Sequence, residues 1–214
     1  MKVGVLGSGG VAKILASGFL KHGYEVMLGS RMPTKLEDWA MQNPGGVVGT
    51  FAETAAFAEI VVLVVKGKVA AEALRLAGAG NLAGKTIIDT CNPIEDAPPM
   101  NGVLKFFSTL DQSLMESLQR EFRDAHLVKA FNSVGSALMV NPQFGSERPT
   151  MFICGNDATA KQAVSGILDQ FGWDVEDMGG AEAARAIEPL CMLWCIPGML
   201  RNEWTHAFKL LKLK

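Results

Sequence analysis

A glycine-rich turn between an apolar run and a helical pattern constrains this chain more than any other feature. Residues 2–6 read Lys-Val-Gly-Val-Leu, and Gly7-Ser8-Gly9-Gly10-Val11-Ala12 follows directly. Glycines permit a tight turn and let the backbone approach a ligand closely, while the small Ala12 lets the following helix pack near the strand. The helix then directs its free N–H groups at an anion. This pattern predicts a dinucleotide whose pyrophosphate lies on the turn.

Short runs rich in Val, Ile and Leu alternate with helical patterns along the chain. Such alternation predicts a parallel sheet built from βαβ units. The run at residues 60–65 is continuously apolar, as expected of a central strand covered on both faces. We therefore predict an α/β, Rossmann-type fold with a doubly wound, mostly parallel sheet and C-terminal helices. The expected strands are residues 2–6, 24–29, 47–50, 60–65, 85–90, 126–131, 151–155 and 173–178.

Chain length and the lack of a linker indicate one domain. The 214 residues, 49% of them hydrophobic, can build a full core. We predict a single NADP-binding domain over residues 1–214, in which 181–214 form a C-terminal helical segment broken at Pro197-Gly198. After an irregular stretch at 91–102, the capping-box spacing of Thr109 and Gln112 predicts that a helix resumes near residue 110.

Charge and cysteine content restrict the partners. The 20 Lys and Arg nearly balance the 22 Asp and Glu, which disfavours nucleic acid and anionic membranes and favours small molecules. The apolar run at 189–200 is shorter than the roughly 20 residues that span a bilayer, so we expect no membrane segment. The four cysteines show no CxxC spacing, and the chain opens on a strand-like run instead of a secretory signal. We expect reduced thiols, a cytoplasmic location and no metal site.

The end of the second strand determines which dinucleotide is preferred. An Asp or Glu about 20 residues after the glycines would hold the ribose 2′-hydroxyl of NAD. This chain instead carries Gly29-Ser30-Arg31, and Arg31 can pair with a 2′-phosphate. Thr34 and Glu37 have capping-box spacing, which places Lys35 in a first helical turn where a bound phosphate would offset the unfavourable macrodipole. We predict NADP(H) as the cofactor.

Groups for acid–base chemistry are scarce. The chain has no Ser/His/Asp signature and no Tyr-x-x-x-Lys pair. Reduction of a simple ketone needs a positioned proton donor, whereas hydride transfer to a flavin-like ring needs mainly the alignment of two rings. The scarcity favours a redox cofactor as acceptor. We interpret Cys91, Cys191 and Cys195 as packing residues, because no histidine stands beside Cys91 and the other two share a helix face.

Four stretches resemble one known family. They are Gly7-Ser8-Gly9-Gly10, Gly29-Ser30-Arg31, residues 89–93 and residues 128–132. Through them the chain resembles the NADPH-dependent reductases of the deazaflavin coenzyme F-420, the reduced F-420:NADP oxidoreductase family. It is also similar to the related cytosolic oxidoreductase domain of the six-transmembrane metalloreductases. The resemblance implies hydride transfer between NADPH and F-420 or a flavin-like co-substrate, with no residue acting as a discrete catalytic acid or base.

The resemblance also implies a set of NADP-binding residues. The pyrophosphate would lie on Gly7, Gly9, Gly10 and Val11, and the 2′-phosphate among Ser8, Ser30, Arg31 and Lys35. The nicotinamide ribose would lie beside Val65 and Lys66, and the nicotinamide among Asn92, Pro93, Ala130, Phe131 and Asn132.

Other readings stay open. The chain could be a non-catalytic NADP(H)-binding redox sensor, or a reductase of a ferric chelate or of a small carbonyl or imine substrate. A carbonyl or imine reductase would require a proton donor, for which the candidates are Lys66, Asn132 and His206. We predict Trp194, Trp204 and Phe208 as core residues, with an acceptor-site wall or a dimer interface as the alternative. A homodimer through the C-terminal helices is expected.

Overall fold

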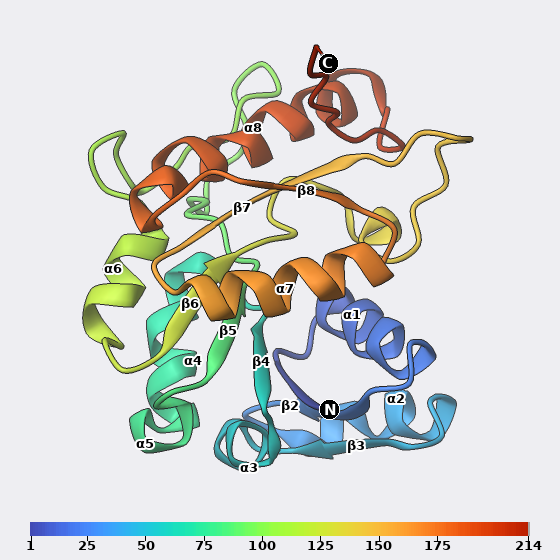
Figure 1. Ribbon diagram of the computed structural model, residues 1–214, viewed down its shortest axis with the longest axis vertical. Helices are drawn as coiled ribbons and strands as arrows, with labels where there is room; N and C mark the ends of the chain where they lie inside the picture. The colour runs from blue at the N-terminus through green and yellow to red at the C-terminus, as the bar shows by residue number, and fades with distance from the viewer. Residues whose placement is uncertain (214) are drawn as a thin grey trace.

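The computed structural model describes residues 1–213 and contains one continuous sheet of eight strands within that range (Figure 1). The strand order is β3-β2-β1-β4-β5-β6-β7-β8, and only the β6–β7 pair is antiparallel. The predicted α/β fold class, with a mostly parallel sheet, is therefore confirmed. The strands are β1 (Lys2–Leu6), β2 (Glu25–Gly29), β3 (Gly46–Gly49), β4 (Ile60–Leu63), β5 (Thr86–Asp89), β6 (His126–Lys129), β7 (Thr150–Gly155) and β8 (Asp174–Asp177).

Helices cover both faces of the sheet. One core lies under α1, α2 and α7, and the other under α3, α4, α5, α6 and the start of α8. The central strand β4 is buried along its whole length, in agreement with its continuously apolar sequence. The helices are α1 (Gly10–Lys21), α2 (Glu37–Gln42), α3 (Phe51–Phe57), α4 (Ala70–Ala77), α5 (Ala79–Leu82), α6 (Leu114–Glu121), α7 (Ala158–Gln170) and α8 (Ala184–Arg201).

The predicted helix start at Thr109 was wrong. Thr109 and Gln112 form a short antiparallel bridge, and α6 begins four residues later than Thr109 implied. There Ser113 is the N-cap and forms a true capping box with Glu116. The predicted box at Thr34 is also absent, because Pro33–Leu36 forms a 3₁₀ turn that shows no side-chain cap. Both errors arose because Ser, Thr, Glu and Gln meet the same spacing in turns.

The C-terminal segment differs from the prediction in two ways. Helix α8 runs without a break through Pro189 and Pro197 and ends at Asn202, which adopts the left-handed conformation with φ 58°. Residues 202–213 are not helical. Gly198 leaves room for the Trp204 ring, since a Cβ there would lie 2.3 Å from it, and this packing lets the chain turn back after α8.

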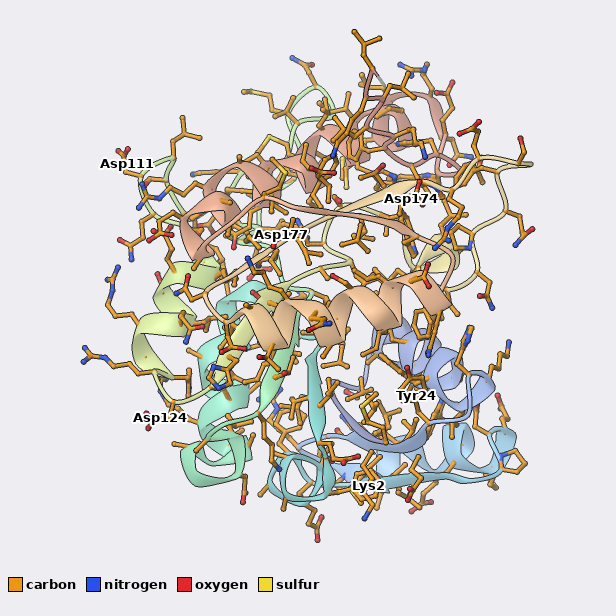
Figure 2. The ribbon with its side chains drawn as sticks, viewed as in Figure 1. Lys2, Tyr24, Asp111, Asp124, Asp174 and Asp177 are labelled. Atoms are coloured by element: carbon orange, nitrogen blue, oxygen red, sulfur yellow. The ribbon has the colours of Figure 1, made fainter. Side chains whose placement is uncertain are left out.

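Residues 202–213 form an irregular strap that contacts the start of β7 and neighbouring residues of β8. The Thr150 amide donates to the Phe208 carbonyl at 2.8 Å, and Lys209 Nζ donates to Asp174 Oδ2 at 2.7 Å. Figure 2 labels Asp174 below the C-terminal segment. Trp204 is 40% exposed, so its prediction as a core residue was wrong, whereas Trp194 is buried as predicted.

Among residues 1–213, one helix meets the length and composition of a membrane span. The stretch Ala181–Arg201 is apolar enough to cross a bilayer, although the sequence run at 189–200 alone is too short. In the fold, the stretch places Ile187, Cys191 and Trp194 against the domain, and its Glu188 is buried and hydrogen-bonded. These are the contacts of a helix that packs on a protein core.

Candidate functional site

A cavity of about 890 Å³ opens at the carboxyl ends of four neighbouring strands. Its walls come from the segments that follow β1, β4, β5 and β6, and from one face of α8. The order β2-β1-β4 makes β1 the point where chain connections run in opposite directions, which is where open α/β sheets bind ligands. The lining residues are Ser8, Gly9, Gly10, Val11, Arg31, Val64, Val65, Lys66, Gly67, Lys68, Val69, Thr90, Cys91, Asn92, Ile94, Glu95, Asp96, Phe131, Asn132, Val134, Gly135, Ser136, Met139, Cys191, Trp194 and Cys195.

The glycine turn has the form that a pyrophosphate requires. Gly7 has φ +152°, and a Cβ there would lie 2.1 Å from the Val64 carbonyl oxygen, so the strand-to-turn contact itself requires glycine. At Gly9 and Gly10 a Cβ would meet open space, so these two leave the backbone accessible from the cavity. Helix α1 starts there with no capping side chain and no acidic residue in its first turn. Its free N–H groups are therefore available to an anion.

A smaller pocket of about 90 Å³ adjoins the turn and is lined by three of the four residues predicted for the 2′-phosphate. Ser8, Ser30 and Arg31 line it, together with Glu72 of α4. Arg31 Nη1 lies 3.7 Å from Glu72 Oε1, and both side chains are largely exposed. Sequence reasoning missed Glu72, because only the tertiary fold brings this carboxylate of α4 to Arg31 after β2. Lys35 lines neither cavity and lies exposed on the 3₁₀ turn.

The nicotinamide residues implied by the resemblance divide into two groups. Asn92, Phe131 and Asn132 line the large cavity, and so do Val65 and Lys66. Pro93 and Ala130 are buried and do not line it. Phe131 holds a positive φ of 63°, a strained conformation for a bulky residue that occurs most often at functional sites.

Two asparagines fasten the loops after β5 and β6 to each other. Asn92 Nδ2 donates to the Asn132 carbonyl at 2.8 Å, and Asn132 Nδ2 donates to Asn92 Oδ1 at 3.2 Å. Asn132 Nδ2 also donates to the Ile187 carbonyl of α8 at 2.9 Å. Its Oδ1 is buried and has no hydrogen-bond partner. The pair therefore sets the spacing between the two loops and the first turn of α8.

A buried ion cluster lies behind the cavity wall. Lys129 Nζ lies 2.7 Å from Asp89 Oδ2 and 3.0 Å from Glu188 Oε1, and it donates to the Cys91 carbonyl at 2.8 Å. All three charged side chains are at most 1% exposed. Burial by itself would lower the pKa of Lys129, but the two carboxylates more than offset it, so the pKa lies above its ordinary value. Lys129 therefore stays charged and holds Cys91 and α8 in place.

Glu188 extends this cluster to the start of α6. Its two oxygens accept hydrogen bonds from the Leu114 and Met115 amides, both at 3.0 Å. These amides belong to the first turn of α6, which has no helical partners for them. Next to this contact, Arg185 Nη2 donates to Glu116 Oε1 at 2.6 Å. Two ionic contacts thus fix α8 against the domain, and so fix the cavity residues that α8 carries.

The cysteines lie in two environments. Cys91, Cys191 and Cys195 line the large cavity, whereas Cys154 is buried elsewhere beside Met115. Burial raises the pKa of the Cys91 thiol well above its usual range, with a further increase from Asp89. Cys91 and Cys191 are buried, as their prediction as packing residues requires, and Cys91 belongs to the hydrophobic core together with Cys154. Cys195 is only partly buried.

Comparison with known proteins identifies the family. The family model described as NADP oxidoreductase coenzyme F420-dependent matches residues 2–93. A crystal structure of a candidate F420-dependent NADP reductase from Arthrobacter sp. FB24 is 34% identical, with a TM-score of 0.92, and the match covers 99% of this chain and 100% of that one. The chain belongs to this family. It is an NADP-dependent oxidoreductase, which agrees with the glycine turn and with Arg31 at the end of β2.

Members and neighbours of the family extend the comparison. Metalloreductase STEAP3 of Rattus norvegicus is 33% identical over 204 residues, which are 93% of this chain and 39% of that protein. Metalloreductase STEAP2 of Homo sapiens is 30% identical over 193 residues, 88% of this chain and 35% of that protein. The oxidoreductase thus spans less than half the length of these curated relatives. An imine reductase of Streptomyces aurantiacus shares the fold, with a TM-score of 0.69 at 16% identity.

Proposed function

We propose that the chain transfers hydride between NADPH and a deazaflavin such as coenzyme F-420, or a flavin-like ring. The observation that carries this proposal is the composition of the cavity. One side is the glycine turn with its open helix N-terminus, and the other is an apolar side that includes Phe131, Met139 and Trp194. A single continuous space can thus hold a nicotinamide next to a second planar ring.

The proton donors that a small carbonyl substrate would require are poorly placed. His206 does not line the cavity and stacks on Trp194, with ring centroids 4.9 Å apart. Lys66 is 82% exposed and pairs with Asp96 at 3.5 Å. Asn132 cannot serve as an acid at neutral pH. For hydride transfer between two rings, the protein needs only to align the rings and to exclude water. That reaction does not depend on a proton donor at any of these three residues.

The chain's own residues would perform three tasks in this reaction. Gly9 and Gly10 would hold the pyrophosphate by backbone N–H groups, and Arg31 would pair with the 2′-phosphate. When bound, NADPH supplies the hydride. The strained Phe131 backbone and the Asn92–Asn132 pair would fix the loops at the nicotinamide end, and α8 would close the cavity against water.

The test is acceptor preference. Purified protein is mixed with NADPH and, separately, with oxidised F-420, FMN, FAD and a ferric chelate, and absorbance is followed in each acceptor's own band. We expect rapid reduction of F-420 or of a flavin. Preferential reduction of the ferric chelate would move the chain toward the activity named for its metalloreductase relatives. Tight NADPH binding without turnover of any acceptor would overturn the proposal and favour a sensor.

We propose further that the outer face of α8 pairs with a second copy of the chain. Leu193 and Leu200 on this face are each 55% exposed. Leu200 also lies against Gly102, so α8 packs beside the loop that contains Gly102. Met100 of this loop is 77% exposed and extends the apolar surface. A helix that is apolar on both faces is usually covered on both.

Light scattering tests this pairing. Leu193→Lys should turn a dimer into a monomer while NADPH binding stays intact. A wild-type protein that is monomeric at all concentrations would refute it.

A further inference from the structure

Two thiols on one face of α8 open into the large cavity. Cys191 and Cys195 are one helical turn apart, a spacing that makes side chains neighbours on a helix surface. Cys191 is 7% exposed and Cys195 is partly exposed. Glu188, three residues before Cys191, anchors this part of the helix to Lys129 and α6. The thiol pair is therefore held by a rigid element.

The two thiols interact with each other. The neighbouring Cys191 thiol lowers the pKa of the Cys195 thiol, although burial works against this. In turn, the Cys195 thiol raises the pKa of Cys191, and burial raises it further. Cys195 is thus the thiol that ionises first, and it does so on the side of the cavity. A thiolate, and not a thiol, is the form that binds a metal ion.

The number of ligands restricts which ion could bind. Within residues 1–213 there is no group of three or more His, Cys, Asp or Glu that could hold a metal ion. A structural zinc ion and an iron–sulfur cluster each require four such ligands, so two thiols are too few to hold either of them. Two thiolates in an otherwise apolar wall suit a soft monovalent ion, for which Cu(I) is the matching first-row metal.

We propose that Cys191 and Cys195 form a two-thiolate site for one Cu(I) ion on the acceptor side of the cavity. Binding joins one Cu(I) to two sulfur atoms and releases the two thiol protons to solvent, with no change in oxidation state. The site is independent of the glycine turn, so NADPH binding is expected to persist. If the proposed hydride acceptor occupies the same space, bound Cu(I) should compete with that acceptor.

The experiment is an anaerobic Cu(I) titration of the full chain against a chromophoric Cu(I) chelator. We expect one ion per chain, about two protons released per ion at a pH below the pKa of both thiols, and an X-ray absorption spectrum with two sulfur neighbours. Cys191→Ser and Cys195→Ser should each weaken binding at least tenfold. Cys154→Ser is the matched control, since Cys154 lies outside the cavity, and it should bind as the wild type does.

Three results would overturn the proposal. Binding that survives in Cys195→Ser would show an adventitious site, as would several ions per chain. Loss of binding in Cys91→Ser would mean that a third thiol takes part. Circular dichroism and NADPH binding check that each variant is folded, so a loss of Cu(I) binding can be assigned to the missing sulfur. The Cu(I) titration and the NADPH-binding measurement use no electron acceptor. A failure to bind Cu(I) therefore does not bear on the proposed hydride transfer.

Discussion

Removal of Glu188 should destabilise the domain more than removal of any surface carboxylate. The side chain is 1% exposed and accepts from Lys129, Leu114 and Met115, each at 3.0 Å. Glu188→Ala leaves Lys129 with Asp89 alone and two amides of α6 unpaired. Breaking a buried ion pair costs about 3–5 kcal/mol, and an orphaned buried donor about 1–3 kcal/mol. We expect a loss of about 3–5 kcal/mol, because relaxation and water entry recover part of the sum.

The assays are urea unfolding, which gives the free energy, and thermal unfolding, which gives Tm, each followed by circular dichroism and tryptophan fluorescence. For a chain of this size, a loss of 3–5 kcal/mol lowers Tm by roughly 6–20 °C. Glu182→Gln, at an exposed position just before α8, is the matched control and should change stability by less than about 0.5 kcal/mol. Lys129→Met should be similarly harmful, and the double variant should fall well short of additivity. A Glu188→Ala protein within about 1 kcal/mol of wild type would refute the argument.

Three further predictions concern charged side chains. Arg31→Ala should weaken NADPH binding roughly ten- to hundredfold, the value of a charge-assisted hydrogen bond, and leave NADH nearly unchanged in a fluorescence titration; equal losses would exclude a 2′-phosphate contact. Glu72→Gln should tighten NADPH up to about fivefold, because Arg31 loses its competing partner at 3.7 Å, and a weaker Kd would instead mean that Glu72 orients Arg31. Arg185 lowers the pKa of Glu116 to about 2, so the pair stabilises the fold above the ordinary pKa of 4.5, and this contribution is lost as the pH falls from there toward 2. Between pH 6 and 2, the free energy of unfolding should fall less steeply with decreasing pH for Glu116→Gln than for wild type. An identical pH dependence in the two proteins would contradict the coupling between Arg185 and Glu116.

The sequence by itself determined the strands and the glycine turn that lines one side of the cavity. Strand β1 lies at its predicted residues, and the runs predicted for the other seven strands agree with the structure to within one or two residues at each end. These features depend on short-range patterns, namely continuous apolar runs and the tight turn at Gly7. Their residue types recur at fixed local spacing, so they can be read from the sequence, although the clash that Gly7 avoids is with the distant Val64 carbonyl.

The tertiary structure alone decided which residues of α8 line the cavity and the course of the C-terminus. Glu72 and Glu188 act through partners far away in the sequence, and nothing in their local spacing indicates those partners. The spacing of Cys191 and Cys195 is local, but only the fold places this pair on the cavity wall. Pro197 predicted a break in α8 because a proline removes one helical hydrogen bond. Burial of one face of α8 on the sheet and of Trp204 on Gly198 outweighs that loss. Packing between distant segments sets these outcomes, and a single chain's periodicity carries no record of it.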